Sequence, residues 1–118
     1  MRNELIGKQG ENIARNYLTS HNYIILAQNW TCHWGEIDLI ALIGKVLVFV
    51  EVKYRSTNKF GSAYEAFNRY KQLHLKRSIN IYLQMHSQIN SNWQLDLICI
   101  DKEDQKFVLT HYKKIDFN

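Results

Sequence analysis

The chain has no proline at all, and only five glycines and two cysteines among its 118 residues. A proline-rich linker is therefore excluded, and the length fits one domain spanning residues 1–118. Cys32 and Cys99 lie far apart in the sequence, which argues against a disulfide framework and favours reduced thiols. No apolar run approaches the roughly 20 residues of a membrane-spanning helix, and the N-terminal MRNELIGKQG lacks the apolar core of a secretory signal. We expect a cytoplasmic protein with no membrane contact.

Charge of one sign does not dominate either. The 15 Lys and Arg residues against 11 Asp and Glu residues give a formal charge of +4. Such a mildly basic balance is compatible with nucleic acid as a partner, but it is found in proteins of every kind. The 46% hydrophobic content is ordinary for a globular protein and is enough to bury a core.

The pattern of apolar residues predicts an α/β fold in which a mixed central sheet is flanked by helices. An amphipathic helix over residues 4–20, with Asn3 as its N-cap, comes first. Strands follow over 23–28, 37–43 and 46–54, and the last is apolar on both alternating faces, as in a central strand covered on both sides. A helix over 63–85, which a break near Asn68 would divide, precedes strands over 94–100 and 107–112. The expected order is αβββαβ with an extra C-terminal strand.

The dipeptide Gly44-Lys45 separates two of these strands and predicts a two-residue hairpin turn of type II′. If Ile43 faces Val46 across that turn, counting outward places Asp38 opposite Glu51 and Glu36 opposite Lys53. All four charged side chains then lie on the same face of the hairpin, because side chains alternate along a strand.

Two carboxylates at directly opposed positions have Cβ atoms roughly 4.5–5.5 Å apart, so Asp38 and Glu51 repel each other unless a proton or a cation lies between them. A divalent cation suits such a pair, since Mg²⁺ takes oxygen ligands from one or two carboxylates. The backbone carbonyl of Val52 is a further potential ligand, and Lys53 projects to the same face, where it could stabilise charge on a phosphate. The alternative is structural: Glu36 and Lys53 form an ordinary surface ion pair, and the carboxylates bind nothing.

The pattern Gly35-Glu36-Ile37-Asp38 followed by Glu51-Val52-Lys53 resembles the PD-(D/E)XK nuclease motif. The flanking sequence is similar, more narrowly, to the YraN family of uncharacterised bacterial proteins, which is itself similar to archaeal Holliday-junction resolvases and has the restriction-endonuclease-like fold. The resemblance extends to about residue 100. It includes Gly7, Gly10, Glu11, Ala14, Tyr17, Leu18, Asn29, the FVEVKYR run, Phe60, Gly61, Lys71, Tyr82, Leu83, Leu95 and Asp96.

This resemblance implies an endonuclease that depends on Mg²⁺ or Mn²⁺ and hydrolyses phosphodiester bonds in DNA, including branched or single-stranded DNA in repair or recombination. Asp38 and Glu51 would be the metal ligands together with the Val52 carbonyl. Lys53 would be the catalytic lysine, and Glu11 would approach the same site from the first helix. Junction resolvases act as dimers because they make paired cuts, so the resemblance leaves a homodimer open.

Basic residues after the hairpin would form a rim that binds the polyanion, with Arg55, Lys59 and Lys71 as the nucleic-acid-binding candidates. The chain departs from the family pattern at Thr31 and Gln94, where many relatives have Arg. Both departures would weaken phosphate contacts without touching the core motif.

Three aromatic residues, Trp30, Trp34 and Tyr54, border the hairpin. Aromatic residues near a strand usually serve packing, although they can also stack on splayed bases. Two other functions stay open beside the nuclease. One is a nucleic-acid-binding module of the same fold that cuts nothing, and the other is a structural or interaction protein in which Asp38 and Glu51 share a proton.

Overall fold

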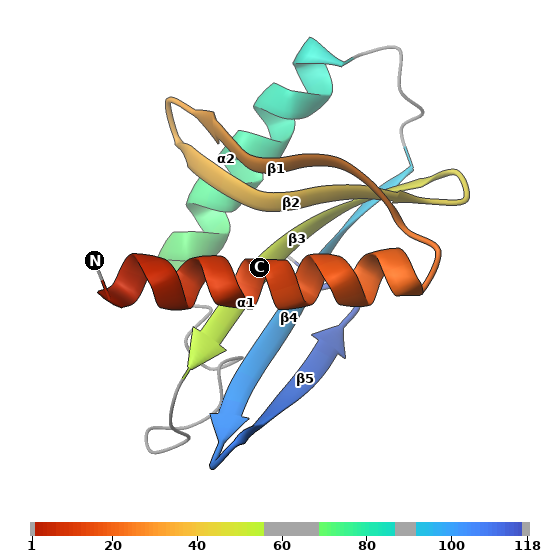
Figure 1. Ribbon diagram of the computed structural model, residues 1–118. Helices are drawn as coiled ribbons and strands as arrows, with labels where there is room; N and C mark the ends of the chain where they lie inside the picture. The colour runs from red at the N-terminus through yellow and green to blue at the C-terminus, as the bar shows by residue number, and fades with distance from the viewer. Residues whose placement is uncertain (1, 56–68, 87–91, 117–118) are drawn as a thin grey trace.

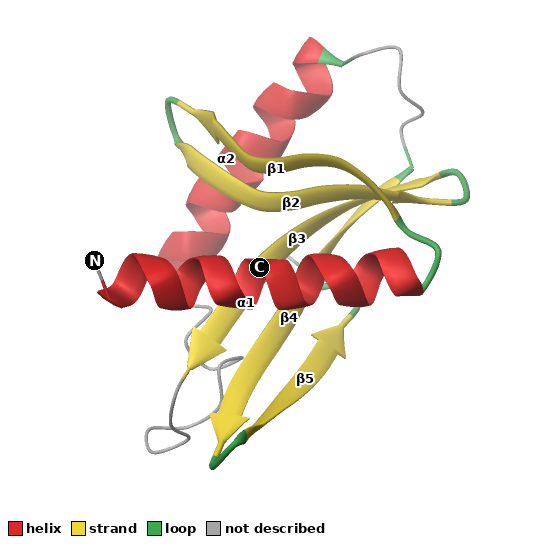
Figure 2. Cartoon of the chain, viewed as in Figure 1, coloured by secondary structure: helices red, strands yellow, loops and turns green. Residues whose placement is uncertain are grey.

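The computed structural model describes residues 2–55, 69–86 and 92–116. One mixed sheet with the strand order β1-β2-β3-β4-β5 forms the centre. Figures 1 and 2 show α1 crossing one face of this sheet, with α2 behind the other. The elements are α1 (Arg2–Ser20), β1 (Ile24–Cys32), β2 (Gly35–Ile43), β3 (Val46–Arg55), α2 (Arg69–Met85), β4 (Trp93–Glu103) and β5 (Lys106–Tyr112). Within these ranges no helix is long and apolar enough to span a membrane.

The order αβββαββ confirms the predicted fold class, including the extra C-terminal strand. Several boundaries differ from the expected ones. The first helix begins at Arg2, so Asn3 lies inside it and is not its N-cap. Strand β1 extends to Cys32, because its pairing with β2 continues to the Cys32–Gly35 pair. The expected helical residues 63–68 and the break near Asn68 lie outside the described ranges.

The β2–β3 turn has the predicted geometry and register. Gly44 has a φ of 58°, while Lys45 is not among the residues with positive φ, as a type II′ turn requires. Ile43 pairs with Val46, and the antiparallel ladder continues to the Leu39–Val50 pair. Strand β3 is also the central strand, with its residues 47–50 fully buried, so the prediction of a strand covered on both faces is confirmed.

Alternation along β3 divides the core between the two faces of the sheet. Val48 and Val50 pack with α1, while Leu47 and Phe49 pack with α2. The α1 face is completed by Ala14, Leu18, Leu39, Ile98 and Ile100, and the α2 face by Ile37, Ile40, Leu75, Ile79, Tyr82, Leu95, Leu97 and Cys99. Burial of these side chains holds both helices against the sheet, at about 25 cal/mol per Å² of apolar surface removed from water.

The sheet divides beyond Leu39 and Val50. The β2–β3 ladder ends at this pair, whereas the parallel β3–β4 ladder continues to Arg55 and Asp101. In Figure 1, β2 curves away together with β1, and β3 continues beside β4. Two strands that are neighbours in the sequence therefore separate within the sheet, and their backbone groups at the fork need other partners.

Candidate metal centre

The fork between β2 and β3 is where Asp38 lies. The Val52 N–H donates a hydrogen bond of 2.8 Å to Asp38 Oδ2, so a side chain replaces the next backbone bond of the ladder. The ladder ends one pair before Asp38 and Glu51, but their side chains form a hydrogen bond, so the two carboxyl groups lie beside each other as predicted. The predicted pairing of Glu36 with Lys53 is wrong, because the ladder ends before it reaches them.

A backbone irregularity at Asn29 and Asp38 changes the face of the sheet to which the following side chains point. Asn29 and Asp38 lie between the Gln28–Leu39 and Trp30–Ile37 pairs, and Asn29 has a φ of 53°. Asn adopts this left-handed conformation more readily than most residues. Ile37 and Leu39 would share one face of a regular strand, yet they pack on opposite faces of the sheet. The pleat therefore inverts at Asp38.

Helix α1 brings a further carboxylate to the fork because Gly10 lets it lie close to β3. A Cβ atom at Gly10 would stand 2.9 Å from the Cβ of Tyr54, which is closer than two such carbons approach. The next residue, Glu11, has a carboxylate oxygen that lies within 4.8 Å of carboxylate oxygens of Glu36 and Asp38. Elements far apart in sequence thus place their carboxylates together.

The carboxyl groups of Glu11, Glu36, Asp38 and Glu51, called the carboxylate cluster below, oppose one another's ionisation. The pKa of Asp38 is raised to about 9, first by burial, then by the negative charge of Glu51 and by a hydrogen bond with it, while the Val52 N–H opposes the shift. Burial also raises the pKa of Glu11; a hydrogen bond with Asn29 lowers it, and the charge of Glu36 raises it further. Such carboxylates favour a bound proton or a cation among them.

Two lysines border the carboxylates. Lys53 Nζ lies 3.4 Å from Glu51 Oε2, and both side chains are only 16% exposed. Lys71 approaches from α2, where the hydrogen-bonding contact with Lys53, together with burial, lowers its pKa, while Glu51 and Asp38 act in the opposite direction. The site therefore combines carboxylate oxygens with two ammonium groups from separate elements.

The donor set fits a hard divalent cation. Asp38 and Glu51 offer carboxylate oxygens. Glu11 Oε1 is buried and has no hydrogen bond of good geometry among the described residues, although the Asn29 and Gln28 side chains lie close enough to lower the pKa of this carboxyl. A buried oxygen without such a bond is costly unless something binds it. The N–H and C=O of one strand residue point to the same side, so the Val52 carbonyl faces the fork as its N–H does. Oxygen ligands of this kind suit Mg²⁺ or Mn²⁺.

The remaining predicted residues lie elsewhere. Arg55, expected at the nucleic-acid rim, pairs with Asp101 on β4, with 3.4 Å between Nε and Oδ1. Lys59 lies outside the described residues. Gln94 donates a hydrogen bond of 2.8 Å to the buried Asp96. Glu36 was not predicted as part of the metal site, although its position two residues before Asp38 could have indicated it.

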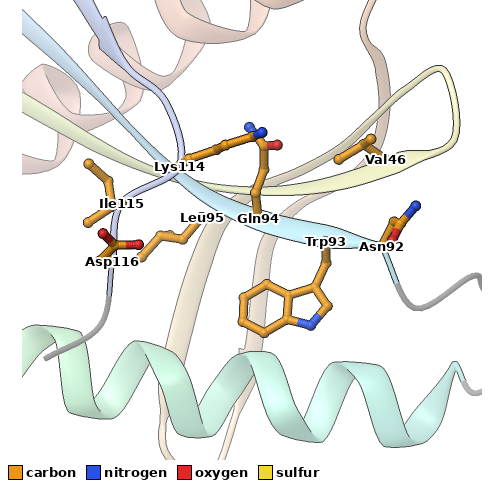
Figure 3. A pocket seen from close by; sticks show the side chains of 8 residues that line it. All are labelled: Val46, Asn92, Trp93, Gln94, Leu95, Lys114, Ile115 and Asp116. Carbon is orange, nitrogen blue, oxygen red and sulfur yellow. The ribbon is translucent and has the colours of Figure 1, made fainter.

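A pocket formed by the described residues at another part of the sheet is remote from these carboxylates. It has a volume of about 530 Å³ and lies at the start of β4, beside the C-terminal segment (Figure 3). Figure 3 shows the Trp93 side chain projecting from β4 toward α2, whereas Gln94 points away from that helix. Val46, which lines this pocket, stands five residues before Glu51 on β3, or ~17 Å along an extended strand. Asp116 is the one carboxylate among the residues that line it.

The sequence matches a described family and several of its members. The profile of the Uncharacterised protein family UPF0102 matches residues 10–100. A protein of Carboxydothermus hydrogenoformans is 34% identical over 110 residues, which are 93% of each chain. A protein of Neisseria meningitidis serogroup C is 42% identical over 95 residues, covering 80% of this chain and 83% of its own. One of Caldicellulosiruptor bescii is 43% identical over 94 residues, 79% of each chain. All three are named as UPF0102 proteins, and that name states no activity.

Proposed function

This chain belongs to the UPF0102 family of uncharacterised proteins, and we propose that it is a divalent-metal-dependent endonuclease that hydrolyses phosphodiester bonds in DNA. The observation that carries the proposal is the fork between β2 and β3. There Asp38, Glu51 and Lys53 meet, and a buried oxygen of Glu11 has no hydrogen bond of good geometry among the described residues. The family name assigns no reaction. The support for the proposed nuclease therefore comes from the chemistry of these side chains.

Each residue has a distinct part in the proposed reaction. Asp38 and Glu51 hold the cation, with the Val52 carbonyl as a further ligand. When bound, a divalent ion lowers the pKa of water and polarises a phosphoryl oxygen. Lys53 faces the same space and stabilises the negative charge that develops on the phosphate. Glu11, whose pKa is raised by burial, orients the attacking water and accepts its proton.

Cleavage assays with a matched control test the proposal. Labelled single-stranded, duplex and four-way-junction DNA would be incubated with Mg²⁺ or Mn²⁺ and the wild type, Glu51→Gln or Glu103→Gln. Glu103 is an exposed carboxylate at the end of β4, so its amide variant loses the same charge away from the fork. We expect Glu51→Gln to lower the rate by at least about 10²-fold, the typical cost of losing one electrostatic contact to the transition state, while Glu103→Gln cuts normally.

The outcomes separate the proposed function from its alternatives. Equal cutting by the wild type and Glu51→Gln would place the activity outside this site. A folded wild type that binds DNA and cuts none of the three substrates would favour a non-catalytic binding module. A protein that neither binds DNA nor gains thermal stability with Mg²⁺ would favour a structural role in which Asp38 and Glu51 share a proton.

A further inference from the structure

A second pocket adjoins the carboxylate cluster. It has a volume of about 260 Å³ and lies between the end of the β1–β2 hairpin and the first turns of α2. The residues that line it include the carboxylates of Glu36 and Glu51 together with Trp34, Lys71 and His74. Because this pocket and the proposed metal centre share two carboxylates, a group bound in it would lie next to the phosphate being cut.

Trp34 differs from the other two tryptophans of the chain. Trp30 packs edge-on against Tyr82, and Trp93 packs against Phe49, with ring centroids 5.3 Å and 5.8 Å apart. Trp34 is 38% exposed and lines the small pocket. Its indole is therefore the most exposed of the three, although it also packs edge-on against His33 and His74, with ring centroids 5.2 Å and 6.4 Å apart, and Trp93 lines the other pocket.

The structure around Trp34 holds the indole in place. The guanidinium carbon of Arg77 lies 4.4 Å from the centre of the Trp34 ring, a cation–π contact. A hydrogen bond of 3.1 Å between His74 Nδ1 and the Trp34 carbonyl oxygen ties the hairpin end to α2. Gly35, with a φ of 141°, adopts a backbone conformation that L side chains rarely allow. A pre-positioned indole loses little conformational entropy when a ligand stacks on it.

An aromatic ring beside ammonium groups is the combination that binds unpaired nucleotides. Bases of any sequence stack on aromatic side chains, and lysines attract the adjoining phosphates. Lys71 lines the pocket and contacts Lys53, so the two lysine side chains connect the pocket of the indole with the fork. A volume of about 260 Å³ is below the roughly 300–1,000 Å³ that accommodates a drug-sized ligand, so it suits one base and not a base pair.

We propose that this pocket binds an unpaired nucleotide next to the scissile phosphate, with its base stacked on Trp34. The substrates are then single strands or DNA with an unpaired or flipped base at the cut, because a base inside a duplex stack cannot reach the indole. This inference rests on the proposed nuclease function for the position of the cut, but the binding of the base does not depend on catalysis.

Equilibrium binding measures the stacking separately from cleavage. Labelled single-stranded oligothymidylate and a blunt duplex would be titrated by fluorescence anisotropy with Ca²⁺ in place of Mg²⁺. The proteins are the wild type, Trp34→Ala, Trp34→Phe and, as a control, Phe107→Ala. Phe107 is a matched residue, since it is 40% exposed and Lys102 lies over its ring.

We expect Trp34→Ala to weaken single-strand binding about tenfold, Trp34→Phe to retain most of it, and Phe107→Ala to leave it unchanged. Duplex affinity should change less than about twofold in all variants, since no base of a blunt duplex reaches the indole. Oligothymidylate should also quench tryptophan fluorescence in the wild type and not in Trp34→Phe. If Trp34→Ala loses stability, the Trp34→Phe quenching result decides alone, because that variant keeps an aromatic ring in the same position.

Failure of this inference and failure of the proposed function give different results. Two results would overturn the stacking pocket and leave metal-dependent cleavage untouched. One is equal affinity of the wild type and Trp34→Ala for single strands, and the other is a loss of duplex affinity in Trp34→Ala as large as its loss of single-strand affinity. Stacking on Trp34 without any metal-dependent cleavage would overturn the nuclease and leave the pocket as the base-binding part of a module that does not cut.

Discussion

Asp38 carries the largest electrostatic consequence of any single residue in the fork. In the folded protein its pKa is raised to about 9 from the ordinary value of 3.8, because burial and the adjacent Glu51 both oppose ionisation. The unfolded chain has no such environment, so between these two values the native state binds more protons than the unfolded state. Metal-free stability must therefore fall as pH rises through that window.

We predict that Asp38→Asn removes much of this pH dependence. In EDTA, the wild-type Tm should decline from pH 5 to pH 9, while the variant, which has no proton to lose at this position, should show a flatter profile. Stabilisation of the wild type by Mg²⁺ should increase over the same range, since protons compete with the cation for Asp38. Calorimetry across pH measures both effects, and Asp116→Asn, at an exposed carboxylate, is the control. Parallel profiles for wild type and Asp38→Asn would contradict the assignment.

At the scale of elements, the packing of α1 on β3 determines where Glu11 lies. The approach depends on Gly10, since a Cβ atom there would lie 2.9 Å from Tyr54 Cβ and 3.0 Å from Tyr54 Cδ2. Alanine favours a helix over glycine by up to ~1 kcal/mol, so a gain in helix propensity opposes the clash. The clash dominates, because the Tyr54 Cβ is fixed to the backbone of β3 and cannot rotate away.

Gly10→Ala should therefore displace α1 and reduce cleavage by about tenfold or more, since small errors in the position of catalytic groups are costly. Asn12→Ala, at an exposed position on the same helix, should have no such effect. The cleavage rate and the Tm of both variants would be measured together. Full activity in a stable Gly10→Ala protein would show that the position of Glu11 does not matter for the reaction.

The elements also show how far the sequence alone could lead. Gly44-Lys45 determines the hairpin register through local turn geometry, so the neighbourhood of Asp38 and Glu51 was predictable. The fork was not predictable, because it results from the left-handed conformation of Asn29 and from the loss of ladder pairing beyond Leu39. The contact of Lys71 with Lys53 depends on how α2 packs against the sheet, which periodicity does not specify.

The same reasoning applies to the one cross-strand pair that was predicted wrongly. Simple counting along a regular hairpin placed Glu36 opposite Lys53. The inverted pleat at Asp38 instead directs Glu36 toward Glu11, while Lys53 pairs with Glu51. Local patterns predict regular strands well, whereas the candidate site residues occupy the irregular part of the sheet, where backbone geometry departs from the repeat.

For the molecule as a whole, the formal charge of +4 favours a polyanion, yet the fork itself is acidic. Glu11, Glu36, Asp38 and Glu51 converge there against Lys53 and Lys71. In the metal-free protein, a phosphate entering the fork would meet the negative charges of Glu36 and Glu51 at short range, although the net charge of the whole chain is positive. A divalent cation would remove this conflict, because it neutralises the carboxylates and binds phosphate oxygens itself.

DNA affinity should therefore depend on the divalent ion in a way that net charge alone does not explain. In EDTA we expect Glu51→Gln to bind single-stranded DNA several-fold more tightly than the wild type, because one repelling charge is gone. With Ca²⁺, the wild type should gain affinity and the variant should gain much less, so that their order reverses. Anisotropy titrations at constant ionic strength measure this, since screening changes any phosphate contact. An equal gain of affinity with Ca²⁺ in both proteins would mean that the ion acts on the DNA and not at the fork. The carboxylate cluster would then repel DNA, and it would not be a metal-dependent binding site.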